Sequence, residues 1–295
     1  MYDFESFYKV ETVDEAIEAL EKQDEAIVIS GGSDVLVKIR EGKLAGCSLI
    51  SIHNIPELKG IRLLEDGTIS IGAAQTFYEV TNNELVRRYI PILGNAVDQA
   101  GGPQLRKVGT IGGNICNGAT SADSASTLFI LNAQLVLKSK KGVHTIPINE
   151  FYLGPGKTIR EHNELLTEIR IPRKDYEQFY GHYIKYGKRK AMEIATLGCA
   201  CGVRLSPDKR KVEEVRLSYG VAAPTPIRCG SIEAWACGKE LKKDFVELFG
   251  KKALEEVNPR SSWRASKEFR LQLVEELAKR ALIQAVTYAG GEIDA

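Results

Sequence analysis

The stretch IVISGGSD, which runs from Ile27 to Asp34, joins a short apolar run to a pair of glycines. Consecutive β-branched residues are typical of a buried strand, and glycine reaches backbone angles that are closed to other residues. The main chain after the strand can therefore turn sharply, so that successive N–H groups form a nest for an anion. The stretch predicts a buried strand that ends in a phosphate-binding turn.

A second stretch of the same kind, GTIGGN, runs from Gly109 to Asn114. Both stretches carry Ser or Thr hydroxyls and have a carboxylate nearby, Asp34 in the first and Asp123 beside the second. We expect both turns to present free backbone N–H groups, and each hydrogen bond to a charged phosphate contributes roughly 1.5 to 3 kcal/mol. Two such turns together could hold the diphosphate of a dinucleotide without a lysine or a metal ion.

Two familiar nucleotide motifs are excluded by spacing. Neither stretch has the Gly-x-Gly-x-x-Gly spacing of a Rossmann dinucleotide site. The tripeptide Gly156-Lys157-Thr158 matches the end of a P-loop, but Phe151 stands where that motif requires its first glycine. The sequence therefore predicts a dinucleotide site of another type, or no nucleotide site at all.

The composition narrows the class of protein. The chain has 295 residues and a formal net charge of +1, with basic and acidic residues interspersed, so it lacks the basic footprint of a protein that binds nucleic acid or an anionic membrane. No apolar run approaches the roughly 20 residues of a membrane span. The first residues, MYDFE, lack the basic and apolar regions of a secretion signal. We expect a soluble cytoplasmic protein that binds neither nucleic acid nor membrane.

The six cysteines are scattered along the chain, without a C-x-x-C motif: Cys47, Cys116, Cys199, Cys201, Cys229 and Cys237. An iron–sulfur cluster needs four closely spaced thiolates, and Cys199 and Cys201 supply only two. We therefore expect most of these cysteines to be small buried apolar side chains, and we expect no metal site or cluster in this chain.

The N-terminal part of the chain alternates short strands with short helices, which predicts an α+β fold. Thr12 and Glu15 predict a capping box at the start of a helix, and Asp123 predicts the cap of a later helix. Strands are predicted at residues 26–29, 49–52, 61–64, 68–71 and 134–138, and helices near residues 16–20, 77–80, 92–100 and 125–131. The strands at 61–64 and 68–71 flank a turn and predict a hairpin.

A polar, charged segment after Pro172 is the best candidate for a domain boundary. Strands are predicted beyond it at residues 181–186, 196–205 and 212–221. The rest of the chain is predicted to be helical, with Ser262 capping a helix whose apolar residues recur at helical spacing up to Ala285. Gly290-Gly291 predicts the end of that helix.

Five segments carry a resemblance to a known family: residues 30–36 (SGGSDVL), 102–106 (GPQLR), 110–123 (TIGGNICNGATSAD), 221–228 (VAAPTPIR) and 260–266 (RSSWRAS). Together they resemble the FAD-binding subunit of bacterial molybdenum hydroxylases, closest to the xanthine dehydrogenase type. The second and third segments are close together and long, which makes the resemblance specific. The fourth and fifth are not needed for flavin binding, so they favour this branch over flavoproteins in general.

The resemblance implies a fold of two domains. Residues 1–175 would form an FAD-binding domain of the PCMH type, with α+β subdomains at about 1–57 and 58–175. Residues 176–295 would form an α+β C-terminal domain of the CO dehydrogenase flavoprotein type, with a small antiparallel sheet and a helical bundle.

The resemblance also implies which residues bind FAD. The first stretch would contribute Ile27, Val28, Ile29, Ser30, Gly31, Gly32, Ser33 and Asp34, and the second Gly109, Thr110, Ile111, Gly112, Gly113 and Asn114. Asp123 would accept hydrogen bonds from the ribityl or ribose hydroxyls, and Leu165 and Lys185 would face the flavin ring. One departure concerns the ring pocket, where Ala100-Gly101 stands in place of the aromatic residue of eukaryotic relatives.

The implied function is electron transfer by the flavin, because the cofactor and no side chain carries that chemistry. Iron–sulfur (2Fe-2S) clusters on a small partner subunit would reduce FAD. A large molybdopterin subunit would oxidise xanthine or a similar heterocycle in purine catabolism, and reduced FAD would pass hydride to NAD+. We expect a dimer of heterotrimers, in which this chain contributes no catalytic residue of its own.

Other functions stay open. Within the family, the chain could serve a carbon monoxide, nicotinate or aldehyde dehydrogenase complex. A self-sufficient flavin oxidase would need its own substrate pocket, for which the C-terminal part looks too small. A scaffold subunit whose glycine turns bind nothing is the alternative that is not an enzyme, and the flavin absorbance of the purified chain distinguishes it.

Overall fold

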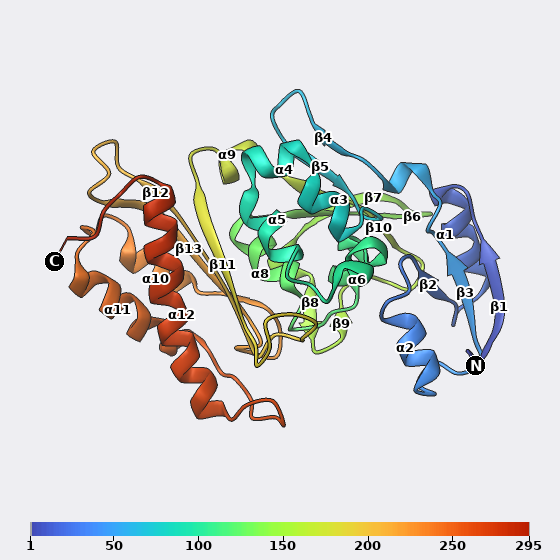
Figure 1. The fold of residues 1–295 in the computed structure, drawn as a ribbon. Helices are drawn as coiled ribbons and strands as arrows, with labels where there is room; N and C mark the ends of the chain where they lie inside the picture. The colour runs from blue at the N-terminus through green and yellow to red at the C-terminus, as the bar shows by residue number, and fades with distance from the viewer. Residues whose placement is uncertain (1, 295) are drawn as a thin grey trace.

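The computed structural model describes residues 2–294, which form three parts that follow one another along the chain (Figure 1). The N-terminal part lies at the right of Figure 1 and the C-terminal part at the left. Each part has a sheet of its own. The central part lies between the other two (Figure 1).

The N-terminal part is a three-stranded parallel sheet with a helix on each face. Its elements are β1 (Phe4–Lys9), α1 (Val13–Lys22), β2 (Ile27–Ile29), α2 (Val35–Arg40) and β3 (Cys47–Ser51), in the strand order β1-β3-β2. The predicted cap of α1 is confirmed, because Thr12 Oγ1 accepts from the Glu15 N–H at 3.1 Å. Neighbouring strand residues face opposite sides, so Ile50 packs in the core cluster of α1 and Leu49 packs with α2.

The central part is built on a five-stranded antiparallel sheet. In the order β4-β5-β10-β6-β7, its strands are β4 (Ile61–Leu63), β5 (Ile69–Gly72), β10 (Leu165–Ile171), β6 (Gln134–Ser139) and β7 (Gly142–Pro147). The predicted hairpin is confirmed, with Ile61 of β4 opposite Ile71 of β5. Ile71 and Ile169 belong to the large core cluster that this sheet shares with the helices of the central part.

Short helices complete the central part: α3 (Phe77–Asn82), α4 (Glu84–Tyr89), α5 (Pro91–Val97), α6 (Pro103–Val108), α7 (Ile111–Cys116) and α8 (Asp123–Ile130). The helices predicted near residues 77–80 and 92–100 correspond to α3 and α5. The prediction that Asp123 caps α8 is wrong, because Ala122 is the capping residue and Asp123 is the first helical residue. The Asp123 carboxylate instead accepts hydrogen bonds from side chains of the C-terminal part.

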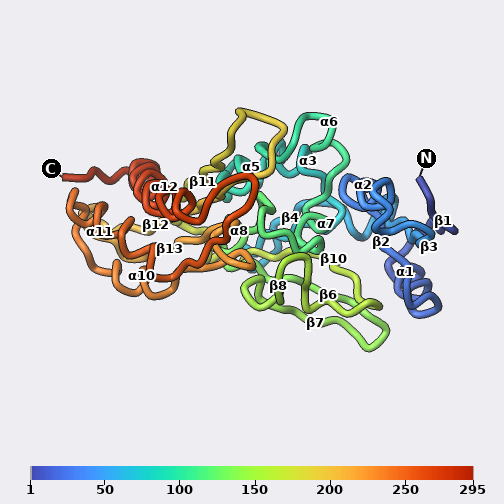
Figure 2. Tube along the Cα trace, turned by 90° about the horizontal axis from the view of Figure 1, so that it is seen from below, coloured from blue at the N-terminus to red at the C-terminus, as the bar shows by residue number. Residues whose placement is uncertain are grey.

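The C-terminal part is a four-stranded antiparallel sheet covered by helices (Figure 2). Its elements are β11 (Tyr180–Tyr186), β12 (Leu197–Leu205), β13 (Val212–Gly220), β14 (Ile227–Arg228), α10 (Gly230–Ala236), α11 (Lys243–Ala253) and α12 (Lys267–Tyr288). The three predicted strands are confirmed as β11, β12 and β13. Helix α12 packs on β11 and β12, and α8 of the central part also contacts β12 and β13. These antiparallel sheets with separate helices confirm the predicted α+β class.

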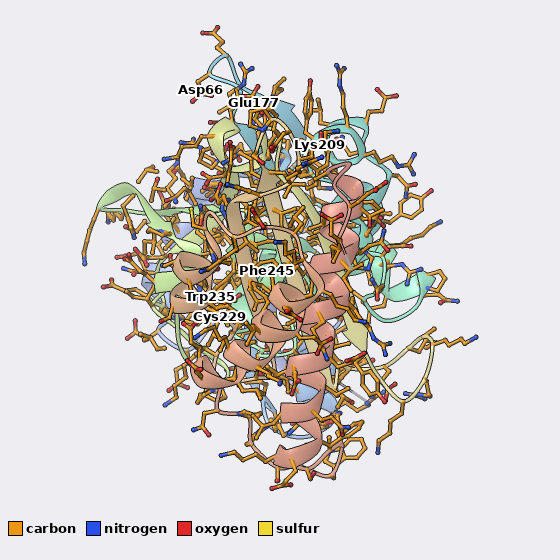
Figure 3. All side chains as sticks on the ribbon, turned by 90° about the vertical axis from the view of Figure 1, so that its left-hand side faces the viewer. Asp66, Glu177, Lys209, Cys229, Trp235 and Phe245 are labelled. Carbon is orange, nitrogen blue, oxygen red and sulfur yellow. The ribbon has the colours of Figure 1, made fainter. Side chains whose placement is uncertain are left out.

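Two details of the C-terminal part differ from the predictions. Ser266 and not Ser262 caps α12, since Ser266 Oγ accepts from the Phe269 N–H at 3.2 Å. Cys199, Cys201 and Cys229 are buried as expected, but Cys237 is exposed. Figure 3 labels Cys229 near the stacked rings of Trp235 and Phe245, whose centroids are 5.7 Å apart.

The joint between the central and C-terminal parts is charged. Arg216 of β13 donates to the carbonyl of Ile130 at 2.8 Å and pairs with the Asp175 carboxylate at 3.0 Å. Asp175 lies in the short helix α9 (Arg173–Tyr176).

The remaining elements are η1 (Pro56–Leu58), η2 (Ile148–Glu150), η3 (Leu254–Glu256), β8 (Tyr152–Gly154) and β9 (Lys157–Thr158). Within residues 2–294, no helix is both long and apolar enough to cross a membrane.

Candidate cofactor site

The first glycine stretch forms an open turn between β2 and α2. Gly32 has a φ of +70°, a left-handed conformation that favours glycine. The consecutive N–H groups of Ser30 to Val35 have no acceptor among the described residues. The Ser30 hydroxyl is buried and also has no partner there. Because an unpaired buried hydroxyl is rare in proteins and the neighbouring N–H groups are free to donate, this turn fits an anionic ligand that accepts several hydrogen bonds, such as a diphosphate.

The two glycine stretches lie in contact, as a shared site requires. A Cβ at Gly31 would lie only 1.7 Å from the carbonyl oxygen of Val108, the residue just before the second stretch. Lys38 of α2 adds a second link, because its Nζ pairs with Asp34 at 2.6 Å and donates to Asn117 Oδ1 at 2.8 Å. Gly31 is thus a position where the N-terminal part lies so close to the central part that no side chain fits between them.

The second stretch differs from the prediction, because it is not an open turn. Residues 111–116 form α7, and Thr110 Oγ1 caps this helix by accepting from the Gly113 N–H at 3.3 Å. The N–H groups of Ile111 and Gly112 donate to the carbonyls of Gln75 and Ala73, both at 2.9 Å. The expectation that both turns present free N–H groups is therefore wrong for this stretch, where long-range backbone contacts use them.

Gly112 is needed for packing inside the protein. A Cβ at this position would lie 2.5 Å from the Ala73 carbonyl oxygen and 2.7 Å from the Ala73 side chain. The neighbouring Asn114 accepts from Ser124 Oγ of α8 at 2.7 Å. The second stretch thus packs tightly within the central part and supports the first turn, and its contact with a cofactor stays a prediction.

Asp123 and Lys185 meet across the joint between the central and C-terminal parts. The Asp123 carboxylate accepts from Lys185 Nζ at 2.9 Å and from the Tyr183 hydroxyl at 2.8 Å. Both side chains of the ion pair are only 9% exposed, and Lys185 Nζ also donates to the Gln99 carbonyl at 2.9 Å. Burial raises the pKa of the Asp123 carboxyl, and the Lys185 ammonium and the Tyr183 hydroxyl offset only part of that increase.

The remaining predicted residues are placed differently. Leu165 begins β10 with a side chain only 4% exposed, in the core cluster of α1, so its predicted contact with a flavin ring stays untested. Ala100-Gly101 lies under the loop of residues 187–194, because the Met192 N–H donates to the Gly101 carbonyl at 3.3 Å. Sequence reasoning missed both this loop contact and the role of Tyr183.

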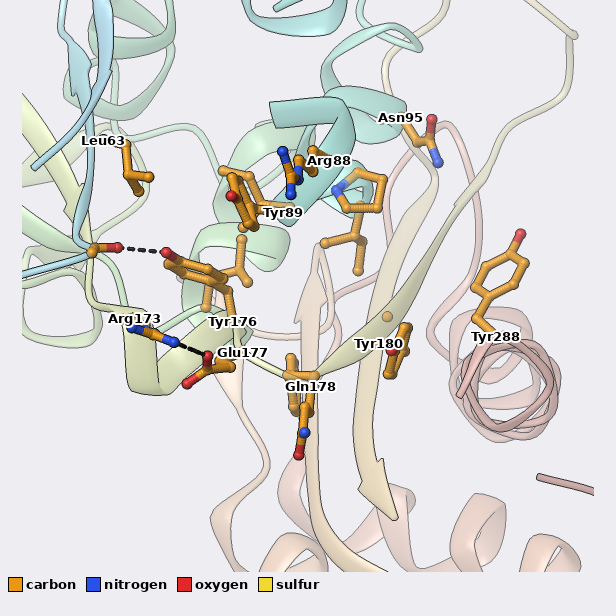
Figure 4. A pocket seen from close by; sticks show the side chains of 17 residues that line it. Leu63, Arg88, Tyr89, Asn95, Arg173, Tyr176, Glu177, Gln178, Tyr180 and Tyr288 are labelled. Atoms are coloured by element: carbon orange, nitrogen blue, oxygen red, sulfur yellow. Dashed lines mark hydrogen bonds and ion pairs between the residues drawn. The ribbon is translucent and has the colours of Figure 1, made fainter. Parts of the chain in front are cut away.

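A cavity of about 620 Å³ lies elsewhere, between α4, α9, β11 and the end of α12 (Figure 4). Tyr89, Tyr176, Tyr180 and Tyr288 line it. No residue of either glycine stretch does. Within residues 2–294, no cluster of His, Cys, Asp or Glu could hold a metal ion. The open first turn is therefore the feature that best fits a cofactor.

Comparisons with known proteins show the family of the chain. Residues 2–174 match the family described as "FAD binding domain in molybdopterin dehydrogenase", and residues 182–285 match the "CO dehydrogenase flavoprotein C-terminal domain". The chain is 43% identical to the xanthine dehydrogenase FAD-binding subunit of Escherichia coli O157:H7, over 99% of this chain and 100% of that one. It is 30% identical to the carbon monoxide dehydrogenase medium chain of Hydrogenophaga pseudoflava, over 94% and 95% of the two chains.

A solved structure of carbon monoxide dehydrogenase from Hydrogenophaga pseudoflava shares the fold. The TM-score is 0.92 at 28% sequence identity, and the match covers 98% of this chain and 99% of that one. The whole chain, and not one part of it, therefore has counterparts among these proteins.

Proposed function

The chain belongs to the family of FAD-binding medium subunits of molybdenum hydroxylases, and from that premise we propose that it transfers electrons in a complex of the xanthine dehydrogenase type. It receives electrons from 2Fe-2S clusters on a partner subunit and passes hydride to NAD+. The observation that carries the proposal is the first glycine turn, where the consecutive N–H groups of Ser30 to Val35 and the buried Ser30 hydroxyl have no partner among the described residues.

The diphosphate of FAD is held by the turn from Ser30 to Asp34. The N–H groups of this turn donate to its oxygens, and charged acceptors strengthen such bonds. The stretch from Gly109 to Asn114 supports the turn from behind and excludes water on that side. When bound, FAD supplies the exchange of single electrons and electron pairs that no side chain provides.

Three residues outside the glycine stretches, Asp123, Lys185 and Leu165, are proposed to bind the rest of the cofactor. Asp123 is proposed to accept hydrogen bonds from ribityl or ribose hydroxyls, and its ion pair with Lys185 holds the carboxylate between the central and C-terminal parts. Lys185 and Leu165 are proposed to lie on the side of the flavin ring. The proposed domain boundary, between residues 175 and 176, lies within α9.

The partners follow from the family. A large subunit carries molybdopterin and oxidises the organic substrate, a small subunit carries the 2Fe-2S clusters, and the whole is a cytoplasmic dimer of heterotrimers. Xanthine is the proposed substrate because of the similarity to the xanthine dehydrogenase subunit. The similarity to the carbon monoxide dehydrogenase medium chain supports the second candidate, a medium subunit of a complex that oxidises another substrate.

Titration of the purified chain with FAD tests the cofactor site. We expect a yellow protein that retains FAD, and Ser30→Ala should weaken binding about tenfold, as expected for one lost hydrogen bond to a charged group. Ser126→Ala is the matched control, because Ser126 is another buried, unpartnered hydroxyl that lies in α8. A chain that binds no FAD would favour the scaffold, and equal affinities of the two variants would remove Ser30 from the site.

The test of the electron acceptor requires the complete complex. With xanthine as substrate, the complex of the three chains should reduce NAD+, and the absorbance of NADH measures this. Rapid reduction of an artificial acceptor without NADH formation would contradict the last step, and no oxidation of xanthine would favour the second candidate.

A further inference from the structure

The segment Arg260–Ser266, which precedes α12, presents the most exposed large apolar side chain of the described residues. Trp263 is 79% exposed. The guanidinium of Arg264 lies 4.3 Å from the centre of its ring. Trp and Arg are the residue types that most often dominate the binding energy of protein interfaces. Nothing in the proposed flavin site uses either side chain.

A buried arginine holds this segment in place. Arg270 of α12 is only 2% exposed, and its guanidinium donates to the Thr196 carbonyl at 3.2 Å and to Ser262 Oγ at 2.8 Å, and also to the Arg260 carbonyl. The Ser262 N–H in turn donates to the Ala265 carbonyl at 2.9 Å. The exposed Trp263 therefore stands on a fixed turn, and a partner that binds it orders few additional side chains.

The segment has positive charge without a counter-charge. Within residues 2–294, no carboxylate lies within ion-pair distance of Arg260, Arg264 or Arg270. The guanidinium of Arg270 is buried and bonded only to neutral oxygens. Arg260 is exposed and Arg264 is half-buried, so both guanidinium groups are open to carboxylates of another molecule.

Apolar side chains extend the surface toward the proposed flavin site. Phe269, near the start of α12, is exposed and meets the ring of Tyr186 edge-on, with centroids 5.7 Å apart. Ile194, also exposed, precedes Thr196, whose carbonyl Arg270 binds. Tyr186 directly follows Lys185, and Ile194 belongs to the loop that lies on Gly101. We call Arg260, Trp263, Arg264, Phe269 and Ile194 the Trp263 surface.

We propose that the Trp263 surface docks the iron–sulfur partner of the complex, through an apolar pocket with a rim of carboxylates on that partner. This inference rests on the proposed function, which requires such a partner. The surface continues into the Lys185 strand and the loop over Gly101, and electron transfer slows steeply with distance. The chain that reduces the flavin must therefore dock close to it, whereas the chain that oxidises the substrate need not.

The test uses the complete complex, with this chain co-expressed with its iron–sulfur and molybdopterin partners. Trp263→Ala should weaken retention of the iron–sulfur chain at least about 30-fold, as expected for a central interface residue. Arg264→Glu should also weaken retention, and added salt should weaken wild-type binding more than that of this variant. Binding is measured by titrating the purified iron–sulfur chain against the FAD-loaded chain.

Two substitutions are matched controls. Leu153 is an apolar side chain of β8 that is 67% exposed, and Lys140 is an exposed cation after β6. Leu153→Ala and Lys140→Glu should leave binding of the iron–sulfur chain unchanged.

The outcomes separate the two proposals. Wild-type affinity of both Trp263→Ala and Arg264→Glu for the iron–sulfur chain would overturn the docking surface, and so would loss of the molybdopterin chain alone. The FAD content is measured on the same samples. A wild-type complex that assembles without FAD would overturn the proposed function. If Trp263→Ala retains FAD but does not bind the iron–sulfur chain, the variant is still folded and has lost only the docking surface.

Discussion

At Gly31-Gly32 the chain makes an open turn whose N–H groups have no acceptor in the described protein, whereas at Gly112-Gly113 the same dipeptide lies in a short capped helix. A Cβ would collide with backbone at both Gly31 and Gly112. The obstacle at Gly31 is Val108, the residue just before the second stretch, and at Gly112 it is Ala73, which follows β5 inside the central part. A pair of glycines thus predicts close approach, but the surrounding backbone decides whether a ligand or the protein itself comes close.

Gly31→Ala should have the largest effect on FAD binding. Its Cβ would lie 1.7 Å from the Val108 carbonyl oxygen, so the first turn must move away from the second stretch. Losing two or more hydrogen bonds to a diphosphate lowers the affinity at least about 100-fold. Titration of the variant with FAD, followed by flavin fluorescence, measures the change.

Gly154→Ala is the matched control, since a Cβ there meets nothing within 4 Å. Its FAD affinity and stability should equal those of the wild type. If Gly31→Ala retained wild-type affinity, the turn would not be the site of the diphosphate.

Gly112→Ala should act on the fold more than on the cofactor. The new Cβ would overlap with Ala73, and overpacking of this kind costs about 1 to 3 kcal/mol of the free energy of unfolding. Urea unfolding of the FAD-free protein measures this loss. A loss of FAD binding without a loss of stability would show that Gly112, like Gly31, contacts the ligand directly.

Much of the fold could be predicted from local patterns. The strands at 27–29 and in the C-terminal sheet, and the hairpin of β4 and β5, follow from runs of β-branched and apolar residues between turn residues. The first glycine turn was predictable for the same reason, because a strand directly precedes it. Helix α7 was not, since glycines disfavour helices and its first N–H groups depend on Ala73 and Gln75, far away in sequence.

The rest of the candidate site depends on contacts between distant segments. Asp123 and Lys185 are 62 positions apart and lie in different parts of the molecule. Nothing near either residue indicates the ion pair, because it requires the C-terminal sheet to pack against α8. The position of the loop over Gly101 cannot be predicted from sequence patterns either, because the Met192 N–H donates to a residue that is far away in the sequence. The contacts of all these residues with FAD stay predictions.

Asp123→Asn tests whether the carboxylate beside the second stretch stabilises the fold without the cofactor. Burial raises the pKa of Asp123 in the folded state. At pH values below the ordinary pKa of this carboxyl in the unfolded chain, the protonated form therefore stabilises the fold. That stabilisation is lost as the pH rises through the raised pKa. In urea unfolding from about pH 4 to pH 7.5, the wild type should therefore lose stability relative to the variant as the pH rises.

The opposite trend would change the conclusion about this ion pair. If the wild type gained stability relative to Asp123→Asn with rising pH, the attraction to Lys185 would outweigh the cost of burial. Lys185→Met is the control, since removal of the ammonium should make the loss of stability with rising pH steeper.

Thr110→Ala should have the smallest effect and separates the two stretches most cleanly. Thr110 caps α7, and loss of a cap costs about 1 kcal/mol of the free energy of unfolding. Thr12→Ala is the matched control, because Thr12 caps α1 in the same way and lies away from the glycine turns. Both variants should lose similar stability and bind FAD within about threefold of the wild type.

Ser30→Ala should do the reverse, with lower affinity and unchanged stability, because its hydroxyl has no partner in the described protein. If Thr110→Ala lost affinity as Ser30→Ala does, the second stretch would bind the ligand as well as support the first.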